Sequence, residues 1–177
     1  AGCETVESFQ ALREDLDRMA LSSTAVEAVA LGVEEEEAFS ELYRLLADGL
    51  ERLEEAPRPG VVLQGFLLHL LRLLGYLPEL HVCVRCRKGV SPHQDASLSP
   101  AAGGIVCNTC RQSVPDCIPA SPAVLGFLRG ASISALRVLD RITILPQPLQ
   151  EVSDILQAFL RHVLGRPLRS ADFLARL

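Results

Sequence analysis

Four of the six cysteines form two close pairs. The sequence reads Cys83-x2-Cys86 and, after twenty further residues, Cys107-x2-Cys110. Each C-x-x-C turn can hold two sulfur atoms on one side of a tight loop, and two such turns supply the four thiolates of a tetrahedral zinc site. Four protein ligands leave no open position for water, so the chemistry is structural and not catalytic. The sequence therefore predicts one structural Zn²⁺ ion.

Other roles for these cysteines have less support. The start of the chain is acidic and lacks the basic and apolar regions of a secretory signal, so disulfides are not expected. One redox dithiol needs only one pair, whereas two matched pairs favour a shared metal. A zinc deaminase requires a histidine followed two residues later by glutamate. None of the four histidines has that neighbour. Cys3 and Cys117 stand apart from both pairs, and we assign them no role.

Basic side chains gather in two places. Four cations surround the cysteine pairs and suit contacts with phosphate, although a solvated rim is the simpler alternative: Arg85, Arg87, Lys88 and Arg111. Three more gather at the end of the last long helix, where a cation also complements the helix dipole without any ligand: Arg161, Arg166 and Arg169. The sequence has no phosphate-binding glycine loop and no nucleophile elbow, so no enzymatic activity is expected.

The elements that must position these residues are mostly helices. Nearly half of the residues are hydrophobic, aromatic residues are few and Trp is absent, which favours helix packing. Apolar periodicity and capping signals predict helices over residues 5–20, 24–32, 34–53, 61–75, 121–130, 132–140, 149–164 and 170–177. The second of these helices is expected to begin at a capping box formed by Thr24 and Glu27. The apolar segment 61–76 contains polar residues and is shorter than a membrane span, so it is expected to be a buried helix.

The expected architecture is mainly α: a helical domain with an inserted four-cysteine zinc-binding module built of short β-hairpin knuckles. Residues 1–80 form the first part of the helical domain, 81–117 form the insert, and 118–177 form a second part that packs on the first. Gly103 and Gly104 are expected to make the turn before the second cysteine pair. The insert is rich in Gly, Pro and Ser, so we expect it to bury too little surface to fold without the metal.

Charge is divided unevenly along the chain. Residues 1–60 carry 15 acidic and 5 basic side chains, and residues 61–177 carry 7 acidic and 12 basic ones. Such a division is expected where the C-terminal part meets a polyanion or an acidic peptide, although an ordinary charged surface is an equal alternative.

Three sequence strings together resemble a known family. These are L-R-L-L-G-Y-L-P-E-L at 71–80, G-G-I-V-C-x-x-C at 103–110, and H-x-L-G-R-P-L-R-S-x-x-F-L at 162–174. The chain is similar to the bacterial RecO family of DNA repair proteins over most of its length. The resemblance implies a non-enzymatic recombination mediator in the cytoplasm, associated with the nucleoid. Such a protein acts with RecR on strands coated by single-strand-binding protein, anneals complementary strands and helps to load RecA.

The resemblance also implies ligands. The family binds single- and double-stranded DNA, so the four cations near the cysteines become DNA-binding candidates. Its helical part is understood to receive the acidic, hydrophobic C-terminal tail of single-strand-binding protein, for which we select Arg137, Arg141, Arg161, Arg166 and Arg169. Family members begin with an oligonucleotide-binding barrel that is missing here, so we expect a fragment, a processed product or a shortened gene product. The alternative function is a zinc-ribbon interaction module in transcription or translation.

Overall fold

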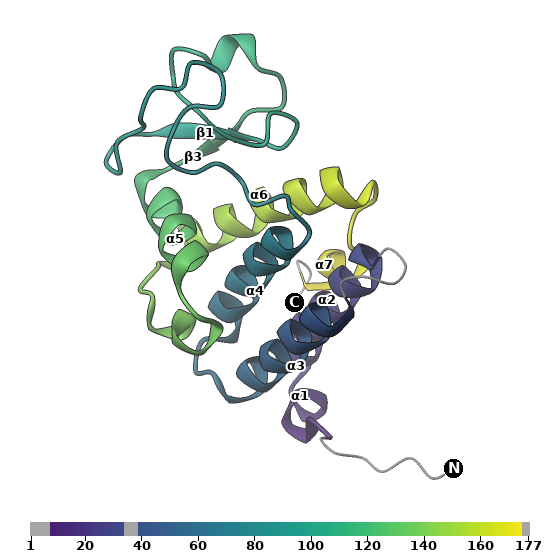
Figure 1. The fold of residues 1–177 in the computed structure, drawn as a ribbon. Coiled ribbons are helices and arrows are strands. Elements are labelled where there is room, and N and C mark those ends of the chain that lie inside the picture. Colours follow the sequence, from purple (N-terminus) through teal and green to yellow (C-terminus); the bar gives the residue numbers. More distant parts are fainter. Residues whose placement is uncertain (1–7, 34–38, 175–177) are drawn as a thin grey trace.

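The computed structural model describes residues 8–33 and 39–174 (Figure 1). Four helices come first: α1 (Gln10–Glu14), α2 (Leu16–Gly32), α3 (Phe39–Glu55) and α4 (Pro59–Leu73). A small sheet follows, made of β1 (Ala96–Ser99), β2 (Gly104–Val106) and β3 (Ile118–Ala120), with the 3-10 turn η1 (Arg111–Ser113) before β3. The chain ends in α5 (Pro122–Ile133), the 3-10 turn η2 (Leu136–Arg141), α6 (Pro146–Leu164) and α7 (Arg169–Leu174). The expected architecture, mainly helical with a small β-containing insert around the cysteines, is confirmed.

Helix α4 is the centre of the helical region. Every residue from Val61 to Leu68 is buried, as are Leu70 and Leu71. Helices α2 and α3 contact α4, and so do α5, η2 and α6 from the later part of the chain. Gly65 allows the closest approach, because a Cβ atom there would lie 2.1 Å from a Leu139 side-chain carbon. Helix α7 completes the packing by returning to α2.

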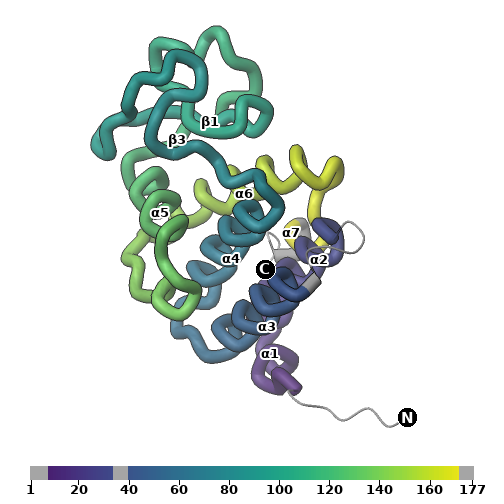
Figure 2. Tube along the Cα trace, viewed as in Figure 1, coloured from purple at the N-terminus to yellow at the C-terminus, as the bar shows by residue number. Residues whose placement is uncertain are grey.

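The sheet lies at one end of the molecule, opposite α1 (Figure 2). Its strand order is β2-β1-β3 and both pairings are antiparallel, with Leu98 opposite Ile105 on one side and Ile118 on the other. The segment before the first cysteine pair extends the sheet, since Ile105 N–H donates to the Glu79 carbonyl at 2.8 Å. Gly104 is required at this crossing, because a Cβ atom would lie 2.5 Å from the Glu79 oxygen.

The insert has an apolar layer of its own. All four β1 residues and all three β2 residues are buried, and Leu98, Ile105 and Val106 have no exposed surface. These side chains join the same hydrophobic cluster as the core of the helical region. The insert thus buries apolar surface together with the helices and shares their core, while the expectation that it needs a metal to fold stays a prediction.

Capping and stop residues predicted helix ends correctly where no other interaction competed for them. Ser121 accepts from Val124 N–H at the start of α5, and Gly165 has a φ of 70° at the end of α6. The predicted boundary between the first two helices is wrong. The break occurs at Asp15, which caps α2 through Arg18 N–H, and α2 continues through the expected capping box. Thr24 instead donates its hydroxyl to the Ala20 carbonyl within the helix.

Other expectations differ in smaller ways. Strand β3 was not anticipated, because the second helical part was expected to begin at residue 118. The acidic run of residues 34–37 falls outside the described residues. Within the described part of the chain, no helix is both long and apolar enough to cross a bilayer.

Candidate metal centre

Two backbone knuckles present the four cysteines. In the first, Arg87 N–H donates to the Cys83 carbonyl at 2.8 Å, and Cys83 N–H donates to the Lys88 carbonyl at 2.8 Å. The turn closes through Arg87, whose φ of 61° is unusual for a residue other than glycine. In the second, Cys110 N–H and Arg111 N–H both donate to the Cys107 carbonyl, at 2.9 and 3.1 Å. Each knuckle therefore turns two side chains to the same side.

The four sulfur atoms form a compact cluster. All four lie within 4.8 Å of one another, and the Cys86 and Cys107 sulfurs are 3.8 Å apart. A regular tetrahedron with a metal–sulfur distance of about 2.3 Å has an edge of about 3.8 Å. Cys83 is buried, while Cys107 and Cys110 are half-buried and Cys86 is exposed. This donor set fits one four-coordinate ion that favours thiolate ligands, so the cluster could hold a metal.

Electrostatics at the cluster favour a cation. Burial opposes ionisation of Cys83, but N–H donors from Cys107, Cys86 and Arg85 outweigh it and lower the pKa of its thiol to about 6. Desolvation and hydrogen bonding by the neighbouring sulfurs, Cys107 first, raise the pKa of Cys110 to about 12. Ionisation of one thiol in the cluster therefore opposes ionisation of the next. A divalent ion at the centre removes that repulsion and permits all four thiolates.

Two carboxylates that the sequence analysis did not select hold the frame around the cysteines. Glu79 accepts from the backbone N–H groups of His81 and Val82, at 2.8 and 3.3 Å, and the His81 donor is the largest cause of its lowered pKa. Asp116, with a φ of 53°, accepts from the Ser99 hydroxyl and from Ala101 N–H at 3.0 and 3.1 Å. These roles could not be predicted from the sequence, because the hydrogen-bond donors of both carboxylates depend on how the loops fold.

The four basic residues expected to contact phosphate all lie on the knuckles or next to them. Arg85, Arg87 and Lys88 belong to the first knuckle, and Arg111 follows the second. All four are exposed. Within residues 8–33 and 39–174, their side chains make no hydrogen bond or ion pair with the protein. The structure thus collects four free cations around one rigid cluster.

The five arginines selected for a partner's tail fall into two groups. Arg137 and Arg141 lie on η2, before α6, whereas Arg161 lies in the last turn of α6, with Arg166 and Arg169 beyond it. The part of α6 that separates the groups, residues 146–161, is about 23 Å long. One short peptide segment in a single pocket does not contact both.

The two groups have different surroundings. Arg137 lines a cavity of about 440 Å³ that is also lined by the acidic residues Asp48 and Glu51 and by Arg52 and His69. Arg161 lines a cavity of about 370 Å³ between α6 and the insert, together with His162 and the apolar side chains of Pro100, Ile118 and Ala158. The Asp116 carboxylate also borders this second cavity but is engaged by Ser99 and Ala101. The second cavity is the more favourable one for an acidic, apolar ligand.

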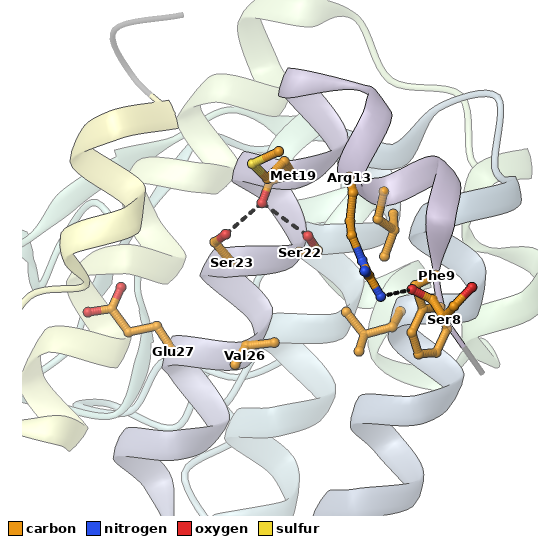
Figure 3. Close-up of a pocket in the computed structure, with 10 residues that line it drawn as sticks. Ser8, Phe9, Arg13, Met19, Ser22, Ser23, Val26 and Glu27 are labelled. Carbon is orange, nitrogen blue, oxygen red and sulfur yellow. Dashed lines mark hydrogen bonds between the residues drawn. The ribbon is translucent and has the colours of Figure 1, made fainter. Parts of the chain in front are cut away.

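A third cavity, of about 430 Å³, lies between α1, α2 and α3 (Figure 3). Apolar side chains, Leu12, Met19 and Val26 among them, make most of its wall. The hydroxyls of Ser22 and Ser23 both donate to the Met19 carbonyl, at 3.0 and 2.7 Å. These hydroxyls are consequently occupied within their own helix, and the groove offers no activated nucleophile among its described lining residues.

Comparison with known proteins agrees with this arrangement. A family model described as the C-terminal part of recombination protein O matches residues 13–172. A DNA repair protein RecO from Roseiflexus sp. is 32% identical over 169 residues, which are 96% of this chain and 59% of that protein. The RecO protein of Desulforudis audaxviator is 37% identical and covers 98% of this chain, which spans 69% of it. The RecO protein of Syntrophus aciditrophicus is 31% identical over 175 residues, which are 97% of this chain and 67% of that protein. The chain thus spans about three fifths to two thirds of these relatives.

Proposed function

Because this chain belongs to the RecO family of DNA repair proteins and matches its C-terminal region, we propose that it is the zinc-binding helical part of a recombination mediator. A role in DNA repair follows from the family. The proposed finer role is to act with RecR on strands coated by single-strand-binding protein, to promote annealing and to help load RecA. It requires binding surfaces and no catalysis. We further propose that the protein acts in the cytoplasm, at the nucleoid.

The proposed cofactor is one Zn²⁺ ion held by Cys83, Cys86, Cys107 and Cys110. Support comes from the all-sulfur donor set and from a sulfur–sulfur distance of 3.8 Å, which suits tetrahedral thiolate ligation. Zinc bound by four thiolates has no open position for substrate, so its proposed role is to fix the two knuckles relative to each other.

The observation that carries the proposed DNA contact is the set of four exposed cations on that frame: Arg85, Arg87, Lys88 and Arg111. Because the two knuckles meet at one cluster, the backbone positions of the cations keep a fixed spacing, so contact with a phosphate backbone needs little reordering of the main chain. Binding of single- and double-stranded DNA through phosphate contacts is expected to weaken steeply with salt.

Salt-dependent titration with labelled DNA tests this interface. Replacing Arg85 and Lys88 by Ala should reduce the slope of log affinity against log salt by about 2 for duplex DNA and somewhat less for a single strand. Arg44→Ala is the matched control, because Arg44 is also exposed but lies on α3, in the acidic part of the chain. An unchanged slope in the double variant would reject the knuckles as the DNA-binding surface.

The proposed site for the tail of single-strand-binding protein is the cavity between α6 and the insert. It combines the guanidinium of Arg161, which no described residue engages, with apolar walls, and an acidic and hydrophobic tail requires that pairing. Arg166 and Arg169 lie just beyond the same end of α6 and are proposed to add charge. Arg137 and Arg141 remain proposed as a weaker, separate group, since Asp48 and Glu51 line the cavity of Arg137 and its second arginine, Arg52, is already paired with Glu55 and Asp140.

Peptide titration separates the two groups of arginines. A fluorescent tail peptide should bind saturably, and Arg161→Ala should weaken it by about tenfold, the loss expected for one charge-assisted contact. Arg137→Ala should change the affinity by less than about twofold. A larger loss of affinity in Arg137→Ala than in Arg161→Ala would indicate that the tail binds at η2 instead. A zinc ribbon in transcription or translation fits less well, because the family match covers residues 13–172, which include the helices as well as the cysteines.

A further inference from the structure

A small cavity lies directly beside the basic knuckles and has no role in the proposals above. Its volume is about 320 Å³, at the lower end of the range for small-molecule sites. Three segments enclose it: Val84 and Arg85 of the first knuckle, the turn between β1 and β2, and the segment after the second knuckle, at Ser113–Pro115. The metal cluster and the sheet hold all three, so the cavity exists before any ligand arrives.

The walls combine apolar surface with one free guanidinium. Val84, Val114 and Pro115 face the cavity, together with the methyl groups of Ala101 and Ala102. Arg85 lines it too, and no hydrogen bond or ion pair with the described residues holds its side chain. An arginine guanidinium plane is one of the groups on which an unpaired nucleobase stacks, and the small apolar side chains of the wall leave room for a base beside it.

The polar groups of the cavity are already engaged. Ser99 donates its hydroxyl to the Asp116 carboxylate at 3.0 Å and accepts from Ala102 N–H at 3.0 Å. Ala101 N–H donates to the same carboxylate, and Ser113 donates to the Cys110 carbonyl at 2.8 Å. Few donors or acceptors are left to read the edge of a base. A base held here would be bound by its face, which all four bases share.

One cation borders the cavity and another lies near it in the chain. Arg85 lines the cavity from the first knuckle, and the 3-10 turn that contributes Ser113 to the wall also carries the exposed Arg111. A nucleotide is a flat apolar base joined to an anionic phosphate, so a cavity with a free cation at its wall matches its chemistry. In a duplex the bases are paired and stacked inside, and only a single strand can offer one without a large cost.

We propose that this cavity receives one unpaired nucleobase of a single strand, of any sequence, while Arg85 and Arg111 hold the adjoining phosphates. The proposal rests on the proposed DNA contact of the knuckles and adds a preference to it. The knuckles alone attract any phosphate backbone, and the cavity makes a single strand the better ligand.

Fluorescence anisotropy with three oligonucleotides of equal length tests the proposal: an ordinary single strand, a single strand with abasic sites, and a duplex. The zinc-loaded chain should bind the ordinary strand about tenfold more tightly than the abasic one, as expected for one stacked base. Ala102→Leu, which fills the cavity without changing charge, should remove this difference and leave affinity for the abasic strand unchanged. Ala123→Leu is the control, because Ala123 is equally exposed but lies on α5.

The outcomes are distinguishable. Equal affinity for the ordinary and the abasic strand would contradict the proposed base cavity. A difference in affinity between these strands that persists in Ala102→Leu would contradict it as well. In either case, salt-dependent binding would still support the contact between the knuckles and DNA. Absence of salt-dependent binding to all three oligonucleotides would overturn the knuckle contact itself, and the cavity proposal with it. Arg85→Lys adds a second check: it keeps the charge and should reduce affinity for the ordinary strand more than for the abasic strand.

Discussion

The helical region and the cysteine insert are stabilised by different means within one protein. The helical region buries long apolar side chains around α4, where Phe66, Leu68 and Leu71 have no exposed surface. The insert has a three-stranded sheet of short strands and a single cluster of four sulfurs. Burial of apolar area is spread over many contacts, whereas ligation concentrates its free energy at one point.

This difference explains the surfaces that the two regions present. In the helical region several arginines are committed to backbone carbonyls. Arg18 donates to Leu53, Glu54 and Ala56 at the end of α3, and Arg58 donates to Ile142 and Ile144. In the insert Arg85, Arg87, Lys88 and Arg111 make no such side-chain bonds with the described residues, and the proposed metal would fix the backbone in their place. A compact ligation site thereby leaves charged side chains available for ligands.

Loss of the metal ligands should have the largest effect and should affect the insert first. Apparent zinc-binding free energies of about 10–16 kcal/mol exceed the gain from the few apolar side chains of the sheet. Cys107→Ser, or strong chelation, should remove the metal and abolish amide protection over residues 79–120 in hydrogen exchange, while far-UV circular dichroism retains most of its helical signal. Cys117→Ser is the matched control and should keep one metal per chain. Full protection without metal would show that the sheet is sufficient.

Truncation in the core of the helical region should have the next largest effect. Phe66 is fully buried and packs against Gly49, where an added Cβ atom would lie 2.6 Å from its ring. Phe66→Ala should lower the free energy of unfolding by about 3–5 kcal/mol in a urea titration, since it removes a large side chain and leaves a cavity. Tyr43→Ala, at a site that is 68% exposed on α3, should change it by less than about 0.5 kcal/mol. Similar losses in both variants would contradict the placement of the core.

Removal of the hydrogen bonds that link the two regions should have an intermediate effect on stability. Arg129 of α5 donates to the Leu80 carbonyl at 2.8 Å and to the Val90 carbonyl at 3.0 Å, on either side of the first cysteine pair. Arg129→Ala should cost about 2–3 kcal/mol, because it removes two charge-assisted hydrogen bonds and leaves two carbonyls unpaired. Hydrogen exchange should show faster opening of residues 79–91 with the metal still bound. Exchange as slow as in the unaltered protein would mean that the shared core alone joins the regions.

In the helical region, acidification should have the smallest of these effects, through Glu27. Glu27 accepts from Arg169 N–H, Ser170 N–H and the Ser170 hydroxyl, and so caps α7 from α2. Burial opposes ionisation, but these donors, the Ser170 hydroxyl first, outweigh it and lower the pKa of the carboxyl below 4.5. The stabilisation is therefore complete above pH 4.5 and is lost as pH falls through the lowered pKa.

Glu27→Gln tests this cap at constant pH. The variant should lose about 1 kcal/mol at pH 7, as expected for a weakened helix cap, and should show a smaller decline in stability between pH 5 and pH 3 than the unaltered protein. Thermal unfolding measured at several pH values provides both quantities. An identical decline in the two proteins would assign the acid sensitivity to other carboxylates.

Much of the fold could be predicted because its signals are local. Each C-x-x-C pair, the Ser121 cap and the Gly165 stop depend on residues within a few positions of one another, and the structure has each in the expected arrangement. The boundary at Thr24 failed because its hydroxyl had a competing acceptor in the preceding turn of the helix. Strand β3 was missed because its stability comes from pairing with β1, some twenty residues earlier.

The sequence by itself determined the helical class, the sulfur cluster and the family, since these follow from periodicity and from spacing along the chain. Only the tertiary structure decided which charges act together. It separated Arg137 from Arg161 by the length of α6, bound Arg18, Arg58 and Arg129 to carbonyls distant in sequence, and enclosed a cavity beside Arg85. The physical reason is that a side chain's partner depends on distance in space, and loops of many residues must close before that distance is set.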